Sequence, residues 1–389
     1  MIAFTFPGQG SQRPGMGAAW TDDPAWSLLP ELSEQTGRDL EHLLLHADAD
    51  ELRSTANAQL ATLTTSLLAL TAARRVGVAP GAVAGHSLGE YTALVAAGVL
   101  TPAAAADLVA ARGAAMQAAA DATPGTMAAV LGLGDDAVVE VCADVDDAWV
   151  ANLNAPGQAV VAGTPEGVAA AGEKAKEAGA KRVMALPVGG AFHSPLMASA
   201  AGPLAEALAA APLADAAVPV VADVDAAVHR QADTWRRRLL EQLTAPVRWR
   251  QVQHALFELG VTAVVELGPG GVLTGLAKRT LPDTPRLSVA SPEDLPALLA
   301  LAEDAAPGAS PPDGDQLHGD ERMIVSPSAG SFEPADELAP GRTIDRGHLV
   351  GTVGGIDVRS AFAGLLGGVL ALPGERLAPA QPIAWLWAR

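Results

Sequence analysis

The chain has 389 residues, a formal net charge of −19 at pH 7 and a single cysteine, Cys142. This length is enough for two or three domains with buried cores. The strong negative charge repels nucleic acid, so a nucleic-acid partner is excluded. One cysteine rules out an intramolecular disulfide framework and favours a cytoplasmic location. The sequence predicts neither a signal peptide nor a membrane span.

In the first 120 residues, predicted helices alternate with short apolar strands. Residues 2–6 predict a strand that ends at the glycine-rich loop 7–12. Residues 60–75 have helical periodicity, and Thr101-Pro102 is typical of the start of a helix that runs to about Ala120. This alternation predicts an α/β layer around a parallel sheet.

The segment Gly85-His86-Ser87-Leu88-Gly89 has the Gly-x-Ser-x-Gly form of a nucleophile elbow, between the apolar run Val83-Ala84 and a predicted helix at residues 90–97. In such an elbow the serine hydroxyl is exposed. The amide of the next residue, Leu88, lies at the positive end of the helix and can stabilise an oxyanion. The pattern alone also fits a chance turn in a glycine-rich chain, so it indicates acyl transfer only together with further residues.

Residues 122–188 predict a separate subdomain with the order strand, helix, strand, strand, helix, strand, which is typical of a ferredoxin-like fold. Its predicted strands are 127–133, 149–153, 159–162 and 182–186, and its helices are 135–143 and 165–179. The α/β core then comprises residues 1–121 and 189–300, with a late strand of the main sheet at 261–267. An insertion beside the elbow would form one wall of a cleft.

The composition shifts to Asp, Gly, Pro and Ser near residue 303, so we predict an interdomain linker at 301–320. A small domain follows at 321–389, where a short internal repeat occurs. Ser326-Pro327-Ser328-Ala329-Gly330 recurs as Ser360-Ala361-Phe362-Ala363-Gly364, and Pro340-Gly341-Arg342 recurs as Pro373-Gly374-Glu375. Two related halves joined at Gly354-Gly355 predict an all-β domain with pseudo-twofold symmetry.

A serine nucleophile needs a base, and His193 is the best candidate among the eight histidines. It lies in the loop-like stretch 189–195 after a predicted strand, where catalytic groups are often found. By itself, a histidine in a loop is more often solvated than catalytic. His86 is adjacent to Ser87 on a tight turn, and a packing role is favoured for it.

Residues 1 to about 300 resemble the malonyl-CoA:acyl carrier protein transacylases, which are freestanding acyltransferases of fatty acid and polyketide synthesis. The resemblance rests on motifs that occur together and in order. They are Pro7-Gly8-Gln9-Gly10-Ser11-Gln12, Gly85-His86-Ser87-Leu88-Gly89-Glu90-Tyr91, Ala111-Arg112-Gly113, Asn154-Ala155-Pro156-Gly157-Gln158, Ala191-Phe192-His193-Ser194-Pro195-Leu196-Met197, Gln242-Leu243-Thr244-Ala245-Pro246-Val247 and Glu266-Leu267-Gly268-Pro269-Gly270.

The resemblance implies that Ser87 is the nucleophile, that His193 is its general acid/base, and that the amides of Gln9 and Leu88 hold the oxyanion. Arg112 is implied to form a bidentate pair with the free carboxylate of a malonyl group. The physical chemistry agrees, because a planar guanidinium matches a carboxylate and selects it over acetyl.

Phe192 and Gln242 are implied to belong to the substrate site, with Gln242 helping to orient the histidine. The site therefore resembles a Ser/His dyad rather than a triad with a carboxylate. Gly190 stands where malonyl-selective domains of modular synthases usually have histidine, so Phe192-His193 favours malonyl over methylmalonyl only in part. Ala222 replaces an asparagine common in the family.

The implied reaction is a ping-pong transfer from malonyl-CoA, through Ser87, to the phosphopantetheine thiol of an acyl carrier protein. No metal or bound cofactor is implied. Three alternatives remain: a hydrolase that clears acyl groups from carrier proteins, a transferase for a substituted malonyl unit, and a scaffold protein with a vestigial site. Intact Ser87, His193, Gln9 and Arg112 argue against the scaffold, and Arg112 argues against the hydrolase.

Carrier proteins are acidic, so docking on this acidic chain requires a local basic patch. Candidate residues are Lys174, Lys176, Lys181, Arg182 and the run Arg236-Arg237-Arg238. A solvated surface is the alternative for each of them.

Residues 321–389 resemble the biotinyl/lipoyl carrier domain, a flattened β-barrel of two similar halves. In that family a lysine on the hairpin joining the halves receives the cofactor, whereas the stretch here is Val353-Gly354-Gly355-Ile356-Asp357-Val358. No lysine occurs after Lys278. Because no amide to biotin or lipoate can form, we expect no biotin and a docking or stabilising role for this domain.

Overall fold

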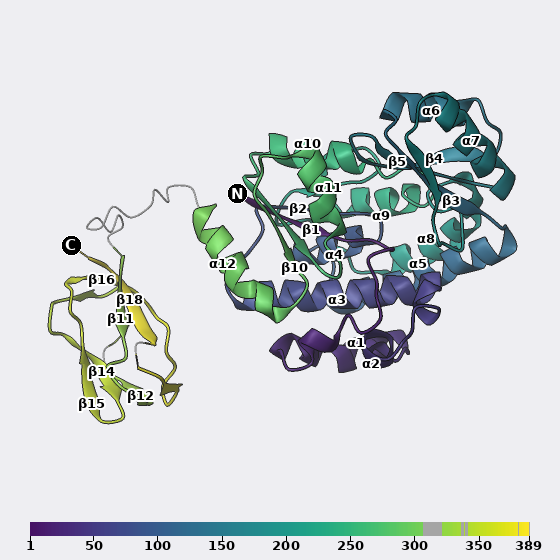
Figure 1. The fold of residues 1–389 in the computed structure, drawn as a ribbon. Helices are drawn as coiled ribbons and strands as arrows, with labels where there is room; N and C mark the ends of the chain where they lie inside the picture. Colours follow the sequence, from purple (N-terminus) through teal and green to yellow (C-terminus); the bar gives the residue numbers. More distant parts are fainter. Residues whose placement is uncertain (306–320, 336–337, 339–340, 380, 389) are drawn as a thin grey trace. The chain divides into compact units, whose positions relative to one another are not determined.

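The computed structural model describes residues 1–305, 321–335, 338, 341–379 and 381–388. The chain forms two compact units, Met1–Ala309 and Ser310–Arg389. The first contains a main sheet with an inserted subdomain, and the second is built from strands (Figure 1). The fold class predicted from the sequence is confirmed: a parallel-sheet α/β core, a ferredoxin-like insertion and a small all-β domain.

A six-stranded sheet with the strand order β10-β9-β1-β2-β7-β8 forms the centre of the first unit. Its strands are β1 (Ile2–Phe6), β2 (Ala82–Gly85), β7 (Val220–Val221), β8 (Val228–His229), β9 (Ala263–Leu267) and β10 (Arg286–Val289). All neighbouring strands are parallel except β7 and β8. Because β1 pairs with both β2 and β9, the loops after these three strands meet at one edge of the sheet.

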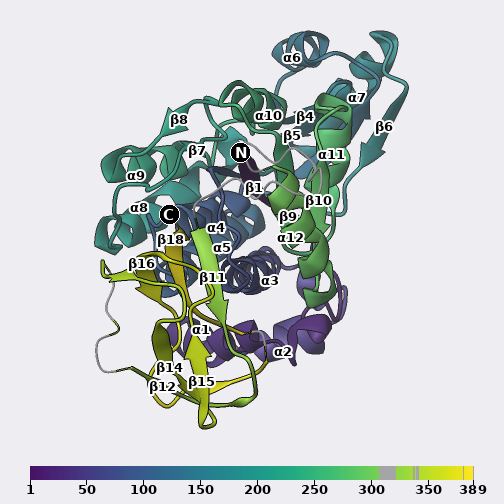
Figure 2. The ribbon, with the colours of Figure 1, turned by 90° about the vertical axis from the view of Figure 1, so that its left-hand side faces the viewer.

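Helices cover both faces of the main sheet (Figures 1 and 2). Side chains alternate along β1, so Phe4 packs in one buried cluster and Ala3 in the other. The Phe4 side includes α3 (Thr55–Arg75), α4 (Gly89–Ala96) and α5 (Pro102–Ala122), and the Ala3 side includes α10 (Trp249–Glu258) and α11 (Val272–Thr280). Burial on both faces explains the continuous apolar character of the strands.

The remaining helices of the core surround these layers. They are α1 (Leu29–Thr36), α2 (Leu40–Leu45), α8 (Ala201–Ala210), α9 (Ala232–Glu241) and α12 (Leu295–Asp304), with short 3-10 helices at Ala18–Trp20, Pro24–Leu28, Glu51–Arg53, Pro195–Ala200 and Pro292–Asp294. No helix in the described residues is both long and apolar enough to cross a membrane.

Helix boundaries agree with the prediction to within two residues except at two places. Helix α3 starts at Thr55 rather than at residue 60, because the Thr55 N–H donates to the Gln117 side chain at 2.9 Å, a distant cap that local periodicity does not reveal. Helix α12 extends to Asp304 and so includes the first residues of the predicted linker. The rest of that linker prediction, from residue 306 to 320, lies outside the described residues.

The inserted subdomain is a four-stranded antiparallel sheet with the order β4-β5-β3-β6 and two helices. Its elements are β3 (Thr126–Leu131), α6 (Asp135–Ala143), β4 (Ala148–Ala155), β5 (Gln158–Gly163), α7 (Pro165–Glu177) and β6 (Arg182–Ala185). Backbone hydrogen bonds tie β4 to the core: Leu153 donates to the Val247 carbonyl at 2.8 Å, and Val247 donates to the Ala151 carbonyl at 2.9 Å.

The second unit contains two four-stranded sheets, in the orders β11-β18-β16-β13 and β15-β14-β12-β17. Its strands are β11 (Glu321–Val325), β12 (Gly330–Pro334), β13 (Thr343–Ile344), β14 (Leu349–Val353), β15 (Ile356–Arg359), β16 (Gly364–Val369), β17 (Arg376–Leu377) and β18 (Pro382–Ala388). Gly354 and Gly355 form the turn between β14 and β15, both with positive φ, 58° and 81°.

The sequence repeat is present in the structure of this unit. The hydroxyl of Ser326 donates to the Ser328 carbonyl at 2.6 Å, and the hydroxyl of Ser360 donates to the Phe362 carbonyl at 2.7 Å. Each serine therefore closes the same turn after the first strand of its half. Gly341 and Gly374, the equivalent glycines of the second motif, have φ values of 87° and 82°, while Pro340 lies outside the described residues.

Candidate active site

Ser87 lies at the sharp turn between β2 and α4, where the sequence predicts a nucleophile elbow. Its φ of 51° is in the left-handed region, which non-glycine residues rarely adopt. The flanking glycines are needed for close packing, because a Cβ on Gly85 would lie 1.9 Å from the Gly89 carbonyl carbon, and one on Gly89 would lie 2.0 Å from the Phe6 oxygen. The two glycines thus let α4 approach β1 and hold Ser87 in its strained position.

His193 contacts Ser87 directly, with 2.8 Å between His193 Nε2 and Ser87 Oγ. On the other side of the ring, Nδ1 lies 2.8 Å from the backbone carbonyl of Gln242. A carbonyl oxygen can only accept, so Nδ1 must carry a proton, and the neutral ring then presents the Nε2 lone pair to the serine hydroxyl. The two side chains are arranged as a nucleophile and a base.

Gln242 contacts the elbow through both its main chain and its side chain. Its main-chain carbonyl, not its side chain, accepts from His193, and its side chain lies behind Ser87. There, Gln242 Nε2 donates to the Ser87 carbonyl at 3.0 Å, and Gln242 Oε1 accepts from Arg112 at 2.9 Å. Gln242 therefore links the histidine, the serine backbone and the arginine.

Arg112 projects from α5 and is almost completely buried. Its Nη2 donates to Ser87 Oγ at 3.1 Å, and its guanidinium lies 5.6 Å from the centre of the Tyr91 ring, within cation–π range. Burial lowers the pKa of Arg112, but a guanidinium remains protonated at neutral pH. A fixed positive charge is therefore held beside the serine hydroxyl.

Burial, reinforced by the Arg112 cation, lowers the pKa of His193 to about 3. The ring is then neutral at pH 7 and available as a base. Burial also lowers the pKa of His86, whose Nε2 lies 2.9 Å from Asn154 Oδ1 and whose ring packs 5.4 Å from that of Trp249. His86 thus contacts Asn154 and Trp249, which agrees with the packing role favoured for it.

The amides of Gln9 and Leu88 belong to the loop after β1 and to the first turn of α4. Neither N–H has an acceptor among the described residues, so both are available to an incoming oxygen. The strands that carry the two loops are direct neighbours, with Phe6 paired to Gly85. The backbone therefore provides two donors of the kind that an oxyanion hole needs.

A cleft of about 200 Å³ lies in front of Ser87, between the core and the inserted subdomain. Four of the predicted site residues besides Ser87 line it: Gln9, Arg112, Phe192 and His193. Leu88 and Gln242 are buried and do not line it. The opposite wall includes Met127, Asn152 and Val160 of the subdomain, so the insertion forms one wall of the cleft.

Comparison with known proteins places this arrangement in a family. Residues 3–298 match the model of the acyl transferase domain. A malonyl CoA-acyl carrier protein transacylase of Bacillus subtilis (strain 168) is 44% identical over 300 residues, which cover 76% of this chain and 95% of that relative. The chain belongs to the malonyl-CoA:acyl carrier protein transacylase family.

Solved structures of the family support the same conclusion. The acyl-carrier-protein S-malonyltransferase of Burkholderia pseudomallei 1710b is 42% identical with a TM-score of 0.74, covering 77% of this chain and 99% of that one. A malonyl-transacylase solved with a type II polyketide synthase acyl carrier protein is 38% identical with a TM-score of 0.73, covering 77% and 99%. Residues after 298 lie outside the family match.

Two buried acidic residues near Ser87 were missed by the sequence reasoning. Asp223 Oδ2 accepts from the Ser87 N–H at 2.6 Å, and Glu90 Oε1 accepts from the Asp223 N–H at 2.6 Å. The available signal was an acidic residue directly after the apolar run 219–222, at the edge of the sheet where the elbow lies. The family resemblance drew attention to Ala222 instead.

The structure also separates the candidate docking residues. The arginine run forms ion pairs with acidic residues of its own helix and of a neighbouring loop. Arg236 pairs with Asp233 at 2.9 Å, and Arg238 pairs with Asp225 at 2.7 Å. Lys174 and Lys176 contact acidic residues of the subdomain. Lys181 and Arg182 are exposed, and no ion pair involves either of them among the described residues. They remain the better candidates for contact with an acidic partner.

Proposed function

We propose that this chain transfers a malonyl group from malonyl-CoA to the phosphopantetheine thiol of an acyl carrier protein, through an ester on Ser87. The observation that carries the proposal is the buried Arg112 guanidinium, 3.1 Å from Ser87 Oγ, beside a Ser/His dyad. A dyad alone fits many acyl transfers. A fixed cation at the nucleophile favours an acyl group that carries its own carboxylate.

In the first half of the reaction, Ser87 Oγ attacks the thioester carbonyl while His193 Nε2 takes the hydroxyl proton. The negative charge that develops on the carbonyl oxygen is stabilised by the free amides of Gln9 and Leu88. Collapse of the tetrahedral intermediate breaks the carbon–sulfur bond, and His193 returns the proton to the departing CoA thiolate. The product is a malonyl ester of Ser87.

The second half reverses these steps with a different thiol. The phosphopantetheine thiol gives its proton to His193 and attacks the ester, and the histidine then protonates Ser87 Oγ as the new thioester leaves. Each proton and bond is accounted for by the two substrates and the dyad, so the mechanism needs no bound cofactor. We place this reaction in the cytoplasm, where it supplies malonyl thioesters for fatty acid or polyketide synthesis.

Direct comparison of transfer with hydrolysis tests this proposal against the hydrolase alternative. With malonyl-CoA and a phosphopantetheinylated carrier protein, we expect malonyl-carrier protein to form much faster than free malonate. Two features favour transfer over hydrolysis: the selecting cation, and a main-chain carbonyl rather than a carboxylate as the partner of His193 Nδ1. Free malonate as the main product, with little labelled carrier, would instead support the hydrolase.

Malonyl is the favoured unit, and a substituted malonyl unit is the second candidate. Phe192 lines the cleft, and a Cβ on Gly190 would lie 2.8 Å from the Ala120 Cβ and 3.1 Å from the Phe192 ring. Gly190 thus packs tightly beneath Phe192 rather than opening space for a branch on the acyl group. Parallel assays with malonyl-CoA and methylmalonyl-CoA would decide between the two units.

A chain truncated after Ala305 should keep malonyl loading. Every residue of the proposed site lies in the unit Met1–Ala309, and the family match ends at residue 298. We therefore expect the truncated protein to form the Ser87 ester at the rate of the full chain, whereas transfer to the physiological carrier protein falls if the β domain helps docking. Quenching the reaction at set times, followed by mass spectrometry of the enzyme, measures formation of the Ser87 ester separately from transfer to the carrier protein.

Loss of loading in a truncated protein that keeps a cooperative unfolding transition would contradict this division of roles. The β domain would then contribute to the acyl-enzyme step itself. An unchanged rate for both steps would assign the domain to stability or to another contact.

A further inference from the structure

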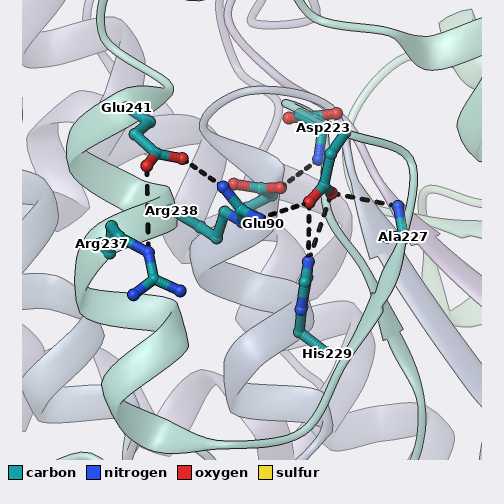
Figure 3. Close-up of polar contacts among 8 residues, drawn as sticks. Glu90, Asp223, Ala227, His229, Arg237, Arg238 and Glu241 are labelled. Atoms are coloured by element: carbon teal, nitrogen blue, oxygen red, sulfur yellow. Dashed lines mark hydrogen bonds and ion pairs between the residues drawn. The ribbon is translucent and has the colours of Figure 1, made fainter.

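Two carboxylates are buried directly behind the nucleophile, although the proposed reaction uses neither. Glu90 is 1% exposed and Asp223 is fully buried. Both lie within hydrogen-bond reach of the same nitrogen, Gln242 Nε2, which donates to Glu90 Oε2 and lies 3.3 Å from Asp223 Oδ2. Figure 3 shows their direct link, from the Asp223 N–H to the Glu90 carboxylate. The two acidic groups therefore form one buried pair.

Asp223 also holds the elbow. Its Oδ2 accepts the Ser87 N–H at 2.6 Å, which fixes the backbone of a residue with a φ of 51°. Its other oxygen, Oδ1, has no hydrogen-bond partner among the described residues. A buried carboxylate oxygen without a donor is costly when the group is charged and far less costly when it is protonated.

The local charge leads to the same conclusion. Among the described residues, Arg112 is the one cation hydrogen-bonded to the Ser87 and Gln242 side chains. If both carboxylates were ionised, two negative charges would face this single guanidinium before any substrate arrived. A malonyl carboxylate would then enter a site that is already net negative. One retained proton leaves the cluster neutral and Arg112 able to attract the substrate.

We propose that Glu90 and Asp223 retain at least one proton at neutral pH, and that Asp223 is a positioning residue that keeps both the elbow and the Arg112 charge ready for malonyl. The inference rests on the proposed function for its link to malonyl, whereas the retained proton is a property of the free protein. The role acts through Ser87 and Arg112, because neither carboxylate lines the cleft.

The charged and titratable groups around the pair come from several elements. Arg112 lies near both carboxylates from α5, and Tyr91 lies near Glu90 on α4. His193 and His86 lie at the elbow, where they contact Ser87 and Asn154. Arg238 on α9 lies toward Glu90 but is paired with Asp225 and Glu241, at 2.7 Å and 2.5 Å (Figure 3). Among the described residues, Arg112 forms no ion pair with a carboxylate, whereas Arg238 forms two.

The pKa values agree with this assignment. Burial raises the pKa of Asp223 to about 8, from an ordinary value of 3.8, and burial together with the charge of Asp223 raises the pKa of Glu90. Because the pKa of Asp223 is higher in the folded than in the unfolded protein, protonation of Asp223 stabilises the fold. This stabilisation is complete below pH 3.8 and is lost as the pH rises toward 8.

Asp223→Asn tests the inference, because the amide oxygen can still accept the Ser87 N–H but cannot ionise. Between pH 5 and 8, the unfolding equilibrium constant of the wild-type protein should rise relative to that of the variant by about tenfold per pH unit, measured by chemical denaturation. The kcat/KM of the wild type for malonyl-CoA should fall above about pH 8, whereas that of the variant should not. Glu90→Gln provides a second variant with only one carboxylate.

Asp225→Asn is the matched control, since it removes a carboxylate from the same loop that pairs with Arg238 rather than with Ser87. It should keep the wild-type pH dependence in both measurements. If Asp223→Asn and Glu90→Gln retain the wild-type pH dependence, the pair holds no proton and the inference is overturned. If the wild type fails to load malonyl at all, the proposed function fails, and the denaturation comparison still tests the proton.

Discussion

Replacing His193 with alanine should slow formation of the Ser87 ester by roughly a hundred- to ten-thousand-fold. The reason is the pair of contacts at 2.8 Å, in which the Gln242 carbonyl fixes the proton on Nδ1 and leaves Nε2 to take the serine proton. Without the ring, the hydroxyl must lose its proton to water. Rapid quenching after addition of malonyl-CoA, followed by intact-protein mass spectrometry, measures the rate.

His86→Gln is the matched control, because His86 is the adjacent, half-buried histidine and glutamine can still contact Asn154. Its loading rate should fall far less than that of His193→Ala. The pH dependence gives a second check. With a His193 pKa of about 3, kcat/KM should show no acid limb near pH 6.5, since the base form persists well below that pH. Equal losses in the two variants would remove His193 from its proposed role.

Replacing Arg112 with alanine should change selectivity as well as rate. Loading from malonyl-CoA should weaken by roughly 30- to 4,000-fold, which corresponds to about 2 to 5 kcal/mol for a charged, hydrogen-bonded pair that loses one partner. Loading from acetyl-CoA should change much less, because acetyl has no carboxylate for the guanidinium to bind. The ratio of kcat/KM for the two thioesters is the quantity to measure.

Arg112→Lys serves as the control for charge without the planar fork. It should recover part of the malonyl preference, since an ammonium attracts a carboxylate but does not bind it in a bidentate way. A wild-type ratio in Arg112→Ala would show that another group selects the carboxylate. Arg112 is buried and contacts Gln242 and Tyr91, so its replacement can also lower the stability of the protein. The free energy of unfolding of each variant should therefore be measured alongside its loading rate.

Local patterns in the sequence were enough to predict the layers of the fold. The apolar strands, the elbow at Ser87 and the strand-helix alternation of the insertion all depend on side-chain periodicity and glycine spacing within short windows. The family resemblance then assigned Ser87, His193, Arg112 and Gln9 together, and the structure places these four residues around one cleft. Their catalytic roles remain predictions that the variants above would test.

Features that depend on long-range contacts could not be predicted. The start of α3 is set by Gln117 on another helix, and the link from Gln242 to His193 runs through a main-chain carbonyl that has no sequence signature. Asp223 resembles an ordinary loop acid in the sequence. Its role becomes visible only when β7 is placed beside β2 and the Ser87 N–H points at its carboxylate.

The most direct test of the central claim is the mass of the protein after incubation with malonyl-CoA alone, without a carrier protein. We predict a gain equal to one malonyl group, located by peptide mapping on the peptide that contains Ser87, and no gain in Ser87→Ala. This result follows from a ping-pong reaction in which the serine ester forms before the second thiol arrives. An unlabelled wild type, a malonyl group on another residue, or a labelled Ser87→Ala protein would contradict the account.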